Sequence, residues 1–191
     1  MDRVDLGVCE GRFHERDPDH VLVLLPGAHY LPLAPLLWFA REAAQRNGWS
    51  VLEVWYEFWE EDDWVEWVKS RARAALEYAS DTRRAVVGKS MASAAAGVVA
   101  DERLPAVWLT PLLGEASVVA GLDATSARTL LVGGTGDASW DGDIARRIPH
   151  AEVLELEGAD HSLQLAGDLP TSIRILGEVT TAIDRFLAEA A

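Results

Sequence analysis

Cysteine is almost absent from this chain of 191 residues. The single Cys9 cannot form an internal disulfide, which fits a reducing compartment. No stretch approaches the roughly 20 apolar residues of a membrane span. The best candidate, residues 85–100, is interrupted by Gly88-Lys89-Ser90. The first residues, Met-Asp-Arg-Val-Asp, are charged where a signal peptide would be apolar, so we expect a soluble, cytoplasmic protein.

Basic residues are also scarce. Lys and Arg together number 17 against 31 Asp and Glu, which gives a formal net charge of −14. The densest basic segment, residues 71–84, is sparse and interleaved with acids. Such a chain repels nucleic-acid phosphates and anionic membrane surfaces, so we expect neither as a partner.

The length and composition indicate one globular domain, residues 1–191. Hydrophobic residues make up 49% of the chain and charged residues 25%, close to the globular average. A chain of this size builds one hydrophobic core and is too short for two ordinary domains. Internal repeats, linkers and low-complexity tracts are missing from the sequence.

Short β-rich runs alternate with helical segments along the chain. This alternation predicts an α/β fold, a doubly wound, mostly parallel sheet with helices on both faces. In the last helix, one face is predicted to carry Ile173, Leu176, Val179, Thr180, Ile183 and Leu187. The predicted strands are Val4–Val8, Val21–Leu25, Val51–Tyr56, Arg84–Val87, Ala106–Leu109, Thr129–Val132 and Glu152–Leu156. The predicted helices are Leu36–Arg46, Trp64–Tyr78, Met91–Val99, Asp143–Ile148 and Ser172–Leu187.

The most informative segment is Gly88-Lys-Ser-Met-Ala92, which follows a predicted strand and opens a helix. This context fits a nucleophile elbow, a tight turn that projects its central residue and needs small residues two positions away on each side. A phosphate-binding P-loop is excluded, because the required first glycine is replaced by Arg83. In isolation, the alternative is an ordinary turn with Ser90 as a helix N-cap.

Two further polar residues follow later strands. Asp137 comes after the strand 129–132, and His161 comes after the strand 152–156. Because the carboxyl ends of parallel strands share one edge of a sheet, Ser90, Asp137 and His161 are expected to lie near that edge. Asp141 and Asp143 are alternatives for the acid, and Asp137 is preferred because it is nearest the strand end.

The motifs Gly88-Lys-Ser-Met-Ala92, Gly134-Thr-Gly-Asp137 and Gly158-Ala-Asp-His161, with the turn Pro26-Gly-Ala-His29, resemble the α/β-hydrolase superfamily over residues 21–187. The resemblance implies Ser90 as nucleophile, His161 as general base and Asp137 as the residue that orients it. It also implies an oxyanion hole made by backbone N–H groups of Met91 and of the turn at Ala28 and His29. Small esterases, thioesterases and dienelactone hydrolases are the nearest types. Dienelactone hydrolases use cysteine where this chain has Ser90, and Ala92 replaces the usual second glycine.

Aromatic residues supply the candidate substrate contacts. The segment 53–67 holds four tryptophans and seven acids. Trp64 and Trp67 are interpreted as core residues of the following helix. Residues 114–128 leave room for a short helix and none for a cap domain, so the site is expected to be open. The candidate substrate-binding residues are Tyr30, Phe58, Trp59 and Trp140.

The leading hypothesis is a lidless serine hydrolase that cleaves a small carboxylic ester or thioester. Two alternatives stay open: a binding protein that keeps the hydrolase fold, and a serine peptidase or acyltransferase that uses the same residues. We expect no cofactor and no metal, because His, Cys and carboxylate spacings do not match a metal site. Cys9 is interpreted as a small packing residue.

Overall fold

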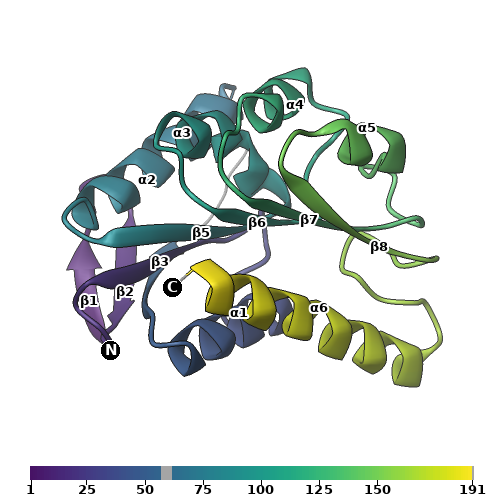
Figure 1. Ribbon diagram of the computed structural model, residues 1–191, viewed down its shortest axis with the longest axis horizontal. Helices are drawn as coiled ribbons and strands as arrows, with labels where there is room; N and C mark the ends of the chain where they lie inside the picture. The colour runs from purple at the N-terminus through teal and green to yellow at the C-terminus, as the bar shows by residue number, and fades with distance from the viewer. Residues whose placement is uncertain (57–61, 191) are drawn as a thin grey trace.

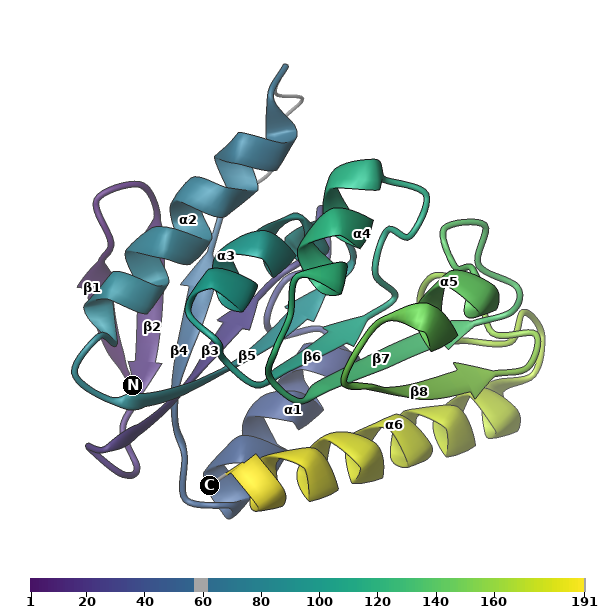
Figure 2. The ribbon, with the colours of Figure 1, turned by 45° about the horizontal axis from the view of Figure 1, so that its top comes forward.

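The computed structural model describes residues 1–56 and 62–190. Within these residues, eight strands form one sheet in the order β1-β2-β4-β3-β5-β6-β7-β8 (Figure 2). The strands from β3 to β8 run parallel, whereas β1 and β2 are antiparallel to their neighbours. The strand bounds are β1 Asp2–Asp5, β2 Glu10–His14, β3 His20–Leu25, β4 Ser50–Trp55, β5 Arg83–Lys89, β6 Ala106–Leu109, β7 Thr129–Gly134 and β8 Ala151–Leu156.

Helices cover both faces of the sheet (Figure 1). Helices α1 and α6 lie side by side on one face, and α2, α3, α4 and α5 cover the other. No helix in the described part of the chain is long and apolar enough to cross a membrane. The helix bounds are α1 Pro35–Arg46, α2 Trp64–Tyr78, α3 Ala96–Asp101, α4 Ala116–Asp123, α5 Gly142–Arg147 and α6 Leu169–Ala190.

Strand β3 shows why the sheet must be covered on both sides. Val21, Val23 and Leu25 belong to the core beneath α2–α5, whereas Leu22 and Leu24 belong to the core beneath α1 and α6. All five side chains are buried. The continuous apolar run of β3 is therefore that of a central parallel strand, as the sequence predicts.

The order of the central strands produces a topological switch point at the carboxyl edge of the sheet. Strand β3 lies between β4 and β5. The chain therefore runs from β3 through α1 to β4 on one side of β3, and then through α2 to β5 on its other side. Connections after β3 and β5 thus diverge to opposite faces of the sheet. Such a switch point, outside the carboxyl ends of the strands, is where open α/β sheets bind ligands.

The N-terminal region differs from the sequence prediction. A strand was expected at Val4–Val8, but the structure has β1 at Asp2–Asp5 and a second strand, β2, at Glu10–His14. They form an antiparallel ribbon that extends the sheet beyond β4. Both strands contain several charged residues, so they lack the apolar pattern from which a strand is predicted. The ribbon is held by backbone pairing at the edge of the sheet.

Two predicted helices also differ in detail. The helix expected at Met91–Val99 is split into a 3₁₀ turn, Ser90–Ala95, and helix α3. In α6, Ile173 was expected on the buried face but is 60% exposed, and Ile175 is buried instead. Ile173 lies in the first turns of α6, where it lines a cavity next to the loop after β8.

Candidate active site

The turn after β5 places Ser90 above the edge of the sheet. Ser90 has a φ of 54°, in the left-handed region that costs a non-glycine residue energy. Gly88 leaves no room for a side chain, since a Cβ there would lie 2.5 Å from the Trp108 ring and 3.3 Å from the Ala92 Cβ. Small residues on both sides of Ser90 therefore allow the sharp turn, as the elbow spacing predicts.

Ser90, His161 and Asp137 are joined in a chain of hydrogen bonds. The Ser90 Oγ lies 2.7 Å from the His161 Nε2, and the His161 Nδ1 lies 2.7 Å from the Asp137 Oδ2. The Asp137 side chain is only 3% exposed, and its Oδ1 accepts a bond from the Ser139 N–H. The His161 side chain is 42% exposed. A buried carboxylate thus orients an imidazole that reaches both the hydroxyl and solvent.

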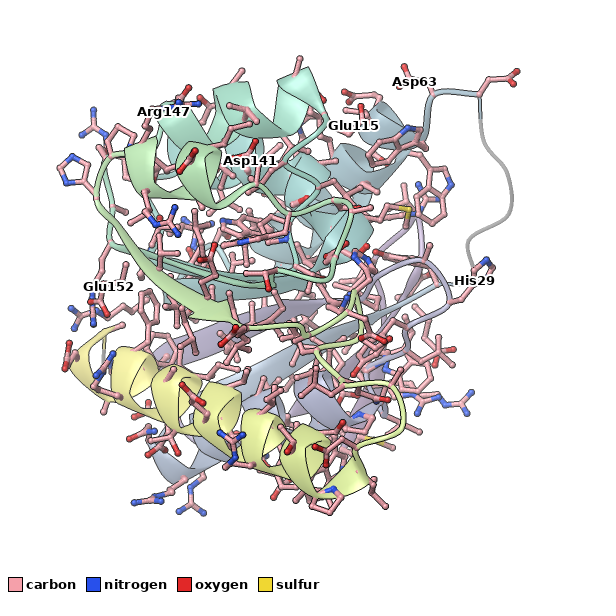
Figure 3. All side chains as sticks on the ribbon, turned by 90° about the vertical axis from the view of Figure 1, so that its right-hand side faces the viewer. His29, Asp63, Glu115, Asp141, Arg147 and Glu152 are labelled. Carbon is pink, nitrogen blue, oxygen red and sulfur yellow. The ribbon has the colours of Figure 1, made fainter. Side chains whose placement is uncertain are left out.

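Asp141 and Asp143, the alternatives for the acid, are engaged elsewhere. Asp141 is the N-cap of α5 and accepts from the backbone N–H groups of Asp143 and Ile144. Asp143 pairs with Arg146 on the exposed surface of α5. Figure 3 shows Asp141 with the helix α5, away from the turn that carries His29. Asp137 is the carboxylate that hydrogen-bonds to the His161 ring, in agreement with the choice of Asp137 over Asp141 and Asp143.

Glycines let the loop after β7 approach the loop after β8. A Cβ on Gly134 would lie 2.1 Å from the Ala159 carbonyl oxygen, and one on Gly136 would lie 2.7 Å from the Gly158 carbonyl oxygen. A hydrogen bond of 3.0 Å from the Gly136 N–H to the Ala159 carbonyl oxygen joins the two loops. The motif Gly134-Thr-Gly-Asp137 therefore brings Asp137 within reach of His161.

We predict that Gly134→Ala lowers the free energy of unfolding by about 3 kcal/mol, because the added methyl group meets a backbone carbonyl that cannot rotate away. Gly177→Ala is the matched control. Gly177 is exposed in α6 with open space around its Cα, so alanine there should raise stability by up to about 1 kcal/mol. Chemical denaturation of both variants measures the difference; equal stabilities would contradict the close approach of the two loops.

The turn after β3 lies against the nucleophile elbow. A Cβ on Gly27 would lie 3.2 Å from the Lys89 carbonyl oxygen and 3.4 Å from the Ser90 Cβ. Ala28 is half-buried in this turn, whereas His29 has a φ of 54° and an exposed side chain that points outward (Figure 3). The turn that carries Ala28 and His29 therefore begins next to Ser90, and Met91 follows Ser90 along the chain.

The candidate substrate-binding residues lie in different surroundings. Tyr30 is half-buried, and its hydroxyl accepts a bond from the Leu36 N–H. Trp140 is a structural residue in this geometry, because its indole fills the space left by Gly133 and its Nε1 donates to Glu155. Phe58 and Trp59 lie outside the described residues.

The two tryptophans interpreted as core residues do pack inward. Trp64 and Trp67 are half-buried against the core beneath α2. The Trp67 ring lies edge-on to the Tyr56 ring, with centroids 4.8 Å apart. The acid Asp63 caps α2 by accepting a bond from the Glu66 N–H, in agreement with acids at a helix start.

A lysine of the elbow was not recognised from the sequence. Lys89, directly before Ser90, is 1% exposed. Its Nζ donates to the Thr110 Oγ1 at 2.5 Å and to the His161 backbone oxygen at 2.8 Å. In Gly-x-Ser-x-Ala the second position is variable, and lysine is rarely buried, so spacing alone does not single it out.

A cavity of about 480 Å³ lies beside the loop that carries His161. Asp160 and Ser162, the two neighbours of His161, line it together with Tyr30. The remaining lining is mostly aliphatic and comes from the start of α1, the loop after β8 and the start of α6. Ser90 and His161 themselves do not line this cavity, so it adjoins the His161 loop and can receive an apolar group there.

Metal-binding residues do not gather in the described part of the chain: residues 1–56 and 62–190 contain no group of three or more His, Cys, Asp or Glu side chains arranged to hold an ion. Cys9 is half-buried against the core beneath α2, and burial raises the pKa of its thiol to about 11. A thiol that holds its proton this strongly is a poor nucleophile.

In residues 1–56 and 62–190, the strand order, the elbow and the position of the polar residues define the α/β-hydrolase fold, and these residues form no cap domain. Helix α4, eight residues long, is the helix between β6 and β7, where the chain was expected to lack a lid. No family model matches the chain, and no curated protein is similar to it in sequence.

Solved structures that are similar to this chain share its fold at low sequence identity. Est1E from Butyrivibrio proteoclasticus is 14% identical, with a TM-score of 0.76 over 99% of this chain and 98% of its own. Dienelactone hydrolase from Anabaena variabilis is 15% identical, with a TM-score of 0.72 over 97% and 94%. XC6422 from Xanthomonas campestris, described as a serine hydrolase without a lid, is 12% identical, with a TM-score of 0.70 over 98% and 93%.

Proposed function

We propose that this chain is a serine hydrolase that cleaves a small carboxylic ester or thioester through an acyl-enzyme intermediate. One observation carries the proposal: the hydrogen-bonded chain from Ser90 through His161 to the buried Asp137. A serine hydroxyl is a weak nucleophile until a base accepts its proton. The imidazole 2.7 Å from the Ser90 Oγ is within reach of that proton.

The reaction follows in two halves. In the first, the Ser90 Oγ forms a bond to the carbonyl carbon while its proton passes to the His161 Nε2. The bond to the leaving oxygen or sulfur then breaks, and the leaving group takes that proton. In the second, water attacks the acyl-enzyme, gives its proton to His161, and the carboxylic acid departs as the proton returns to Ser90. Asp137 holds the imidazole and stabilises its charged form throughout.

The backbone around Ser90 supports the oxyanion role. The tetrahedral intermediate needs N–H donors that are already aimed at its negative oxygen. The donors in this proposal are the Met91 N–H, in the 3₁₀ turn, and a backbone N–H at Ala28 or His29, in the turn whose Gly27 lies next to Ser90. The role of His29 in this scheme is that of its backbone, because its side chain points to solvent.

The surroundings of the site favour a neutral, partly apolar acyl group. The neighbouring cavity is lined mainly by aliphatic side chains, and its polar rim includes the carboxylate of Asp160. The chain as a whole carries a net charge of −14. Both features repel anions, the second over a range that salt shortens.

We predict that a neutral butyrate ester is hydrolysed with a higher kcat/KM than the succinate half-ester of the same alcohol. These acyl groups have the same chain length, so the comparison isolates the charge of the terminal carboxylate. Added salt should reduce the preference, because it screens the repulsion. Initial rates at low and high ionic strength test this. An equal or higher kcat/KM for the anionic ester would contradict the prediction.

Labelling with a fluorophosphonate probe, followed by peptide mapping, tests the function itself. The probe reacts covalently with an activated serine, so we expect the adduct on Ser90. A binding protein with the same fold would leave Ser90 unlabelled, and that result would overturn the proposal. Rates with ester, thioester and peptide substrates, with and without an added acceptor alcohol, then separate hydrolase, peptidase and acyltransferase activity.

A further inference from the structure

Lys89 connects three loops at the carboxyl edge of the sheet. Its Nζ donates to the Thr110 side chain after β6 and to the backbone oxygen of His161 after β8. The same nitrogen lies 5.2 Å from the centroid of the Tyr30 ring, in the turn after β3. This distance is within the range of a cation–π interaction.

The contact with His161 is made to the backbone of the residue itself. The imidazole must meet Ser90 on one side and Asp137 on the other, and both bonds are 2.7 Å long. Hydrogen-bond strength falls steeply with geometry, so a small shift of the loop weakens both contacts. A charge-assisted bond to the carbonyl of His161 is roughly twice as strong as a neutral one.

Burying this ammonium is costly for the fold. Lys89 is 1% exposed, and a buried charge is unfavourable unless it is paired and hydrogen-bonded. Its partners are the two oxygens, the Tyr30 ring and the nearby carboxylates of Asp137 and Asp160. An apolar side chain of similar length would avoid that cost, so stability alone does not explain a lysine here.

We propose that the charged Lys89 is a positioning residue, which fixes the His161 backbone so that the imidazole stays aligned between Ser90 and Asp137. The expected effect on turnover rests on the proposed hydrolase function. The geometric part of the proposal, the alignment of His161, is independent of any substrate.

A pH dependence follows from the burial of Lys89. Burial lowers the pKa of the Lys89 ammonium to about 8, although the carboxylates of Asp137 and Asp160 act in the opposite direction. The other titratable groups that face it are His161 and Tyr30, and burial raises the pKa of the Tyr30 phenol, so this phenol keeps its proton there. Alignment and turnover should therefore decline as the pH rises through about 8.

The contribution of Lys89 to stability has the opposite pH dependence. The pKa of Lys89 is lower in the folded protein than its ordinary value of 10.5. The unfolded chain therefore binds more protons between about 8 and 10.5, and Lys89 makes the folded state relatively more stable as the pH rises through that window. Activity and this contribution to stability change in opposite directions.

The test uses Lys89→Met, which keeps the length of the side chain and removes its charge and its donors. We expect kcat to fall tenfold or more with KM within twofold, and the alkaline decline near pH 8 to disappear. Ser93→Ala is the matched control: Ser93 is as buried as Lys89 and lies in the 3₁₀ turn that follows it, but its Oγ accepts a bond from the Leu112 N–H and makes no contact with the His161 backbone oxygen. The control should keep kcat within twofold and retain the alkaline decline.

Proton NMR supplies a readout that does not need turnover. The proton between the His161 Nδ1 and Asp137 should give a downfield signal, assigned by its loss in His161→Gln. In the wild-type protein this signal should broaden above about pH 8, and in Lys89→Met it should be broad at every pH. A sharp, unchanged signal in both cases would overturn the role of Lys89. Loss of fluorophosphonate labelling in the wild type would overturn the hydrolase function alone.

Discussion

Ser90→Ala should lower ester hydrolysis by about 10⁴- to 10⁶-fold while the protein stays folded. The variant loses the oxygen that attacks the carbonyl, and His161 then has no hydroxyl to activate. Replacing serine by alanine removes the hydroxyl group and adds no volume, so the tight turn after β5 is not crowded. The measurement is kcat/KM on a chromogenic ester, with protein shown to be free of contaminating esterase.

Ser93→Ala provides the control for this change. Ser93 lies in the same 3₁₀ turn and is buried, and its Oγ accepts a bond from the Leu112 N–H. Its removal should cost some stability and little activity. A loss of less than tenfold for Ser90→Ala would rule out Ser90 as the nucleophile.

Asp137→Asn is expected to reduce kcat by about 10³- to 10⁴-fold. The amide has the size of the carboxylate but lacks its charge, so it neither stabilises the imidazolium nor fixes the required tautomer of His161. The side chain is 3% exposed, which means that water cannot replace the lost interaction efficiently. Steady-state kinetics at a fixed pH measure the effect.

Asp141→Asn is the matched control for the same chemical change. Asp141 caps α5, and asparagine caps a helix about as well as aspartate, so this variant should keep both its fold and its activity. A crippling effect of Asp141→Asn, with Asp137→Asn active, would mean that a different carboxylate orients His161 during turnover.

The central architecture was predictable because it follows from local apolar patterns. The run 21–25 is buried on both faces, and the alternation of strands and helices requires layers on both sides of the sheet. The ribbon of β1 and β2 was not predicted correctly, because its strands hold charged residues and depend on antiparallel pairing with β4. Such pairing depends on the assembled sheet and cannot be predicted from local composition.

The grouping of Ser90, Asp137 and His161 was predictable from their positions after strands. The packing of the Trp140 indole on Gly133 and its bond to Glu155 were not predicted, whereas its role as a substrate contact stays a prediction. The Trp140 indole fits there only because residue 133, on strand β7, is a glycine. Lys89 was missed for a related reason: the three loops that satisfy its ammonium come from distant parts of the chain.

The two outer strands of the sheet limit how copies of this protein can associate. Strand β8 carries Glu152, which pairs with Arg128 and Arg185 and projects at the surface in Figure 3. Strand β1 consists largely of exposed charged residues. A second molecule that added its own strand to either edge would have to displace water and counter-charges from these side chains. The sheet is therefore protected against growth into a continuous ribbon of molecules, even though its inner strands are rich in the β-branched and aliphatic residues of aggregating segments.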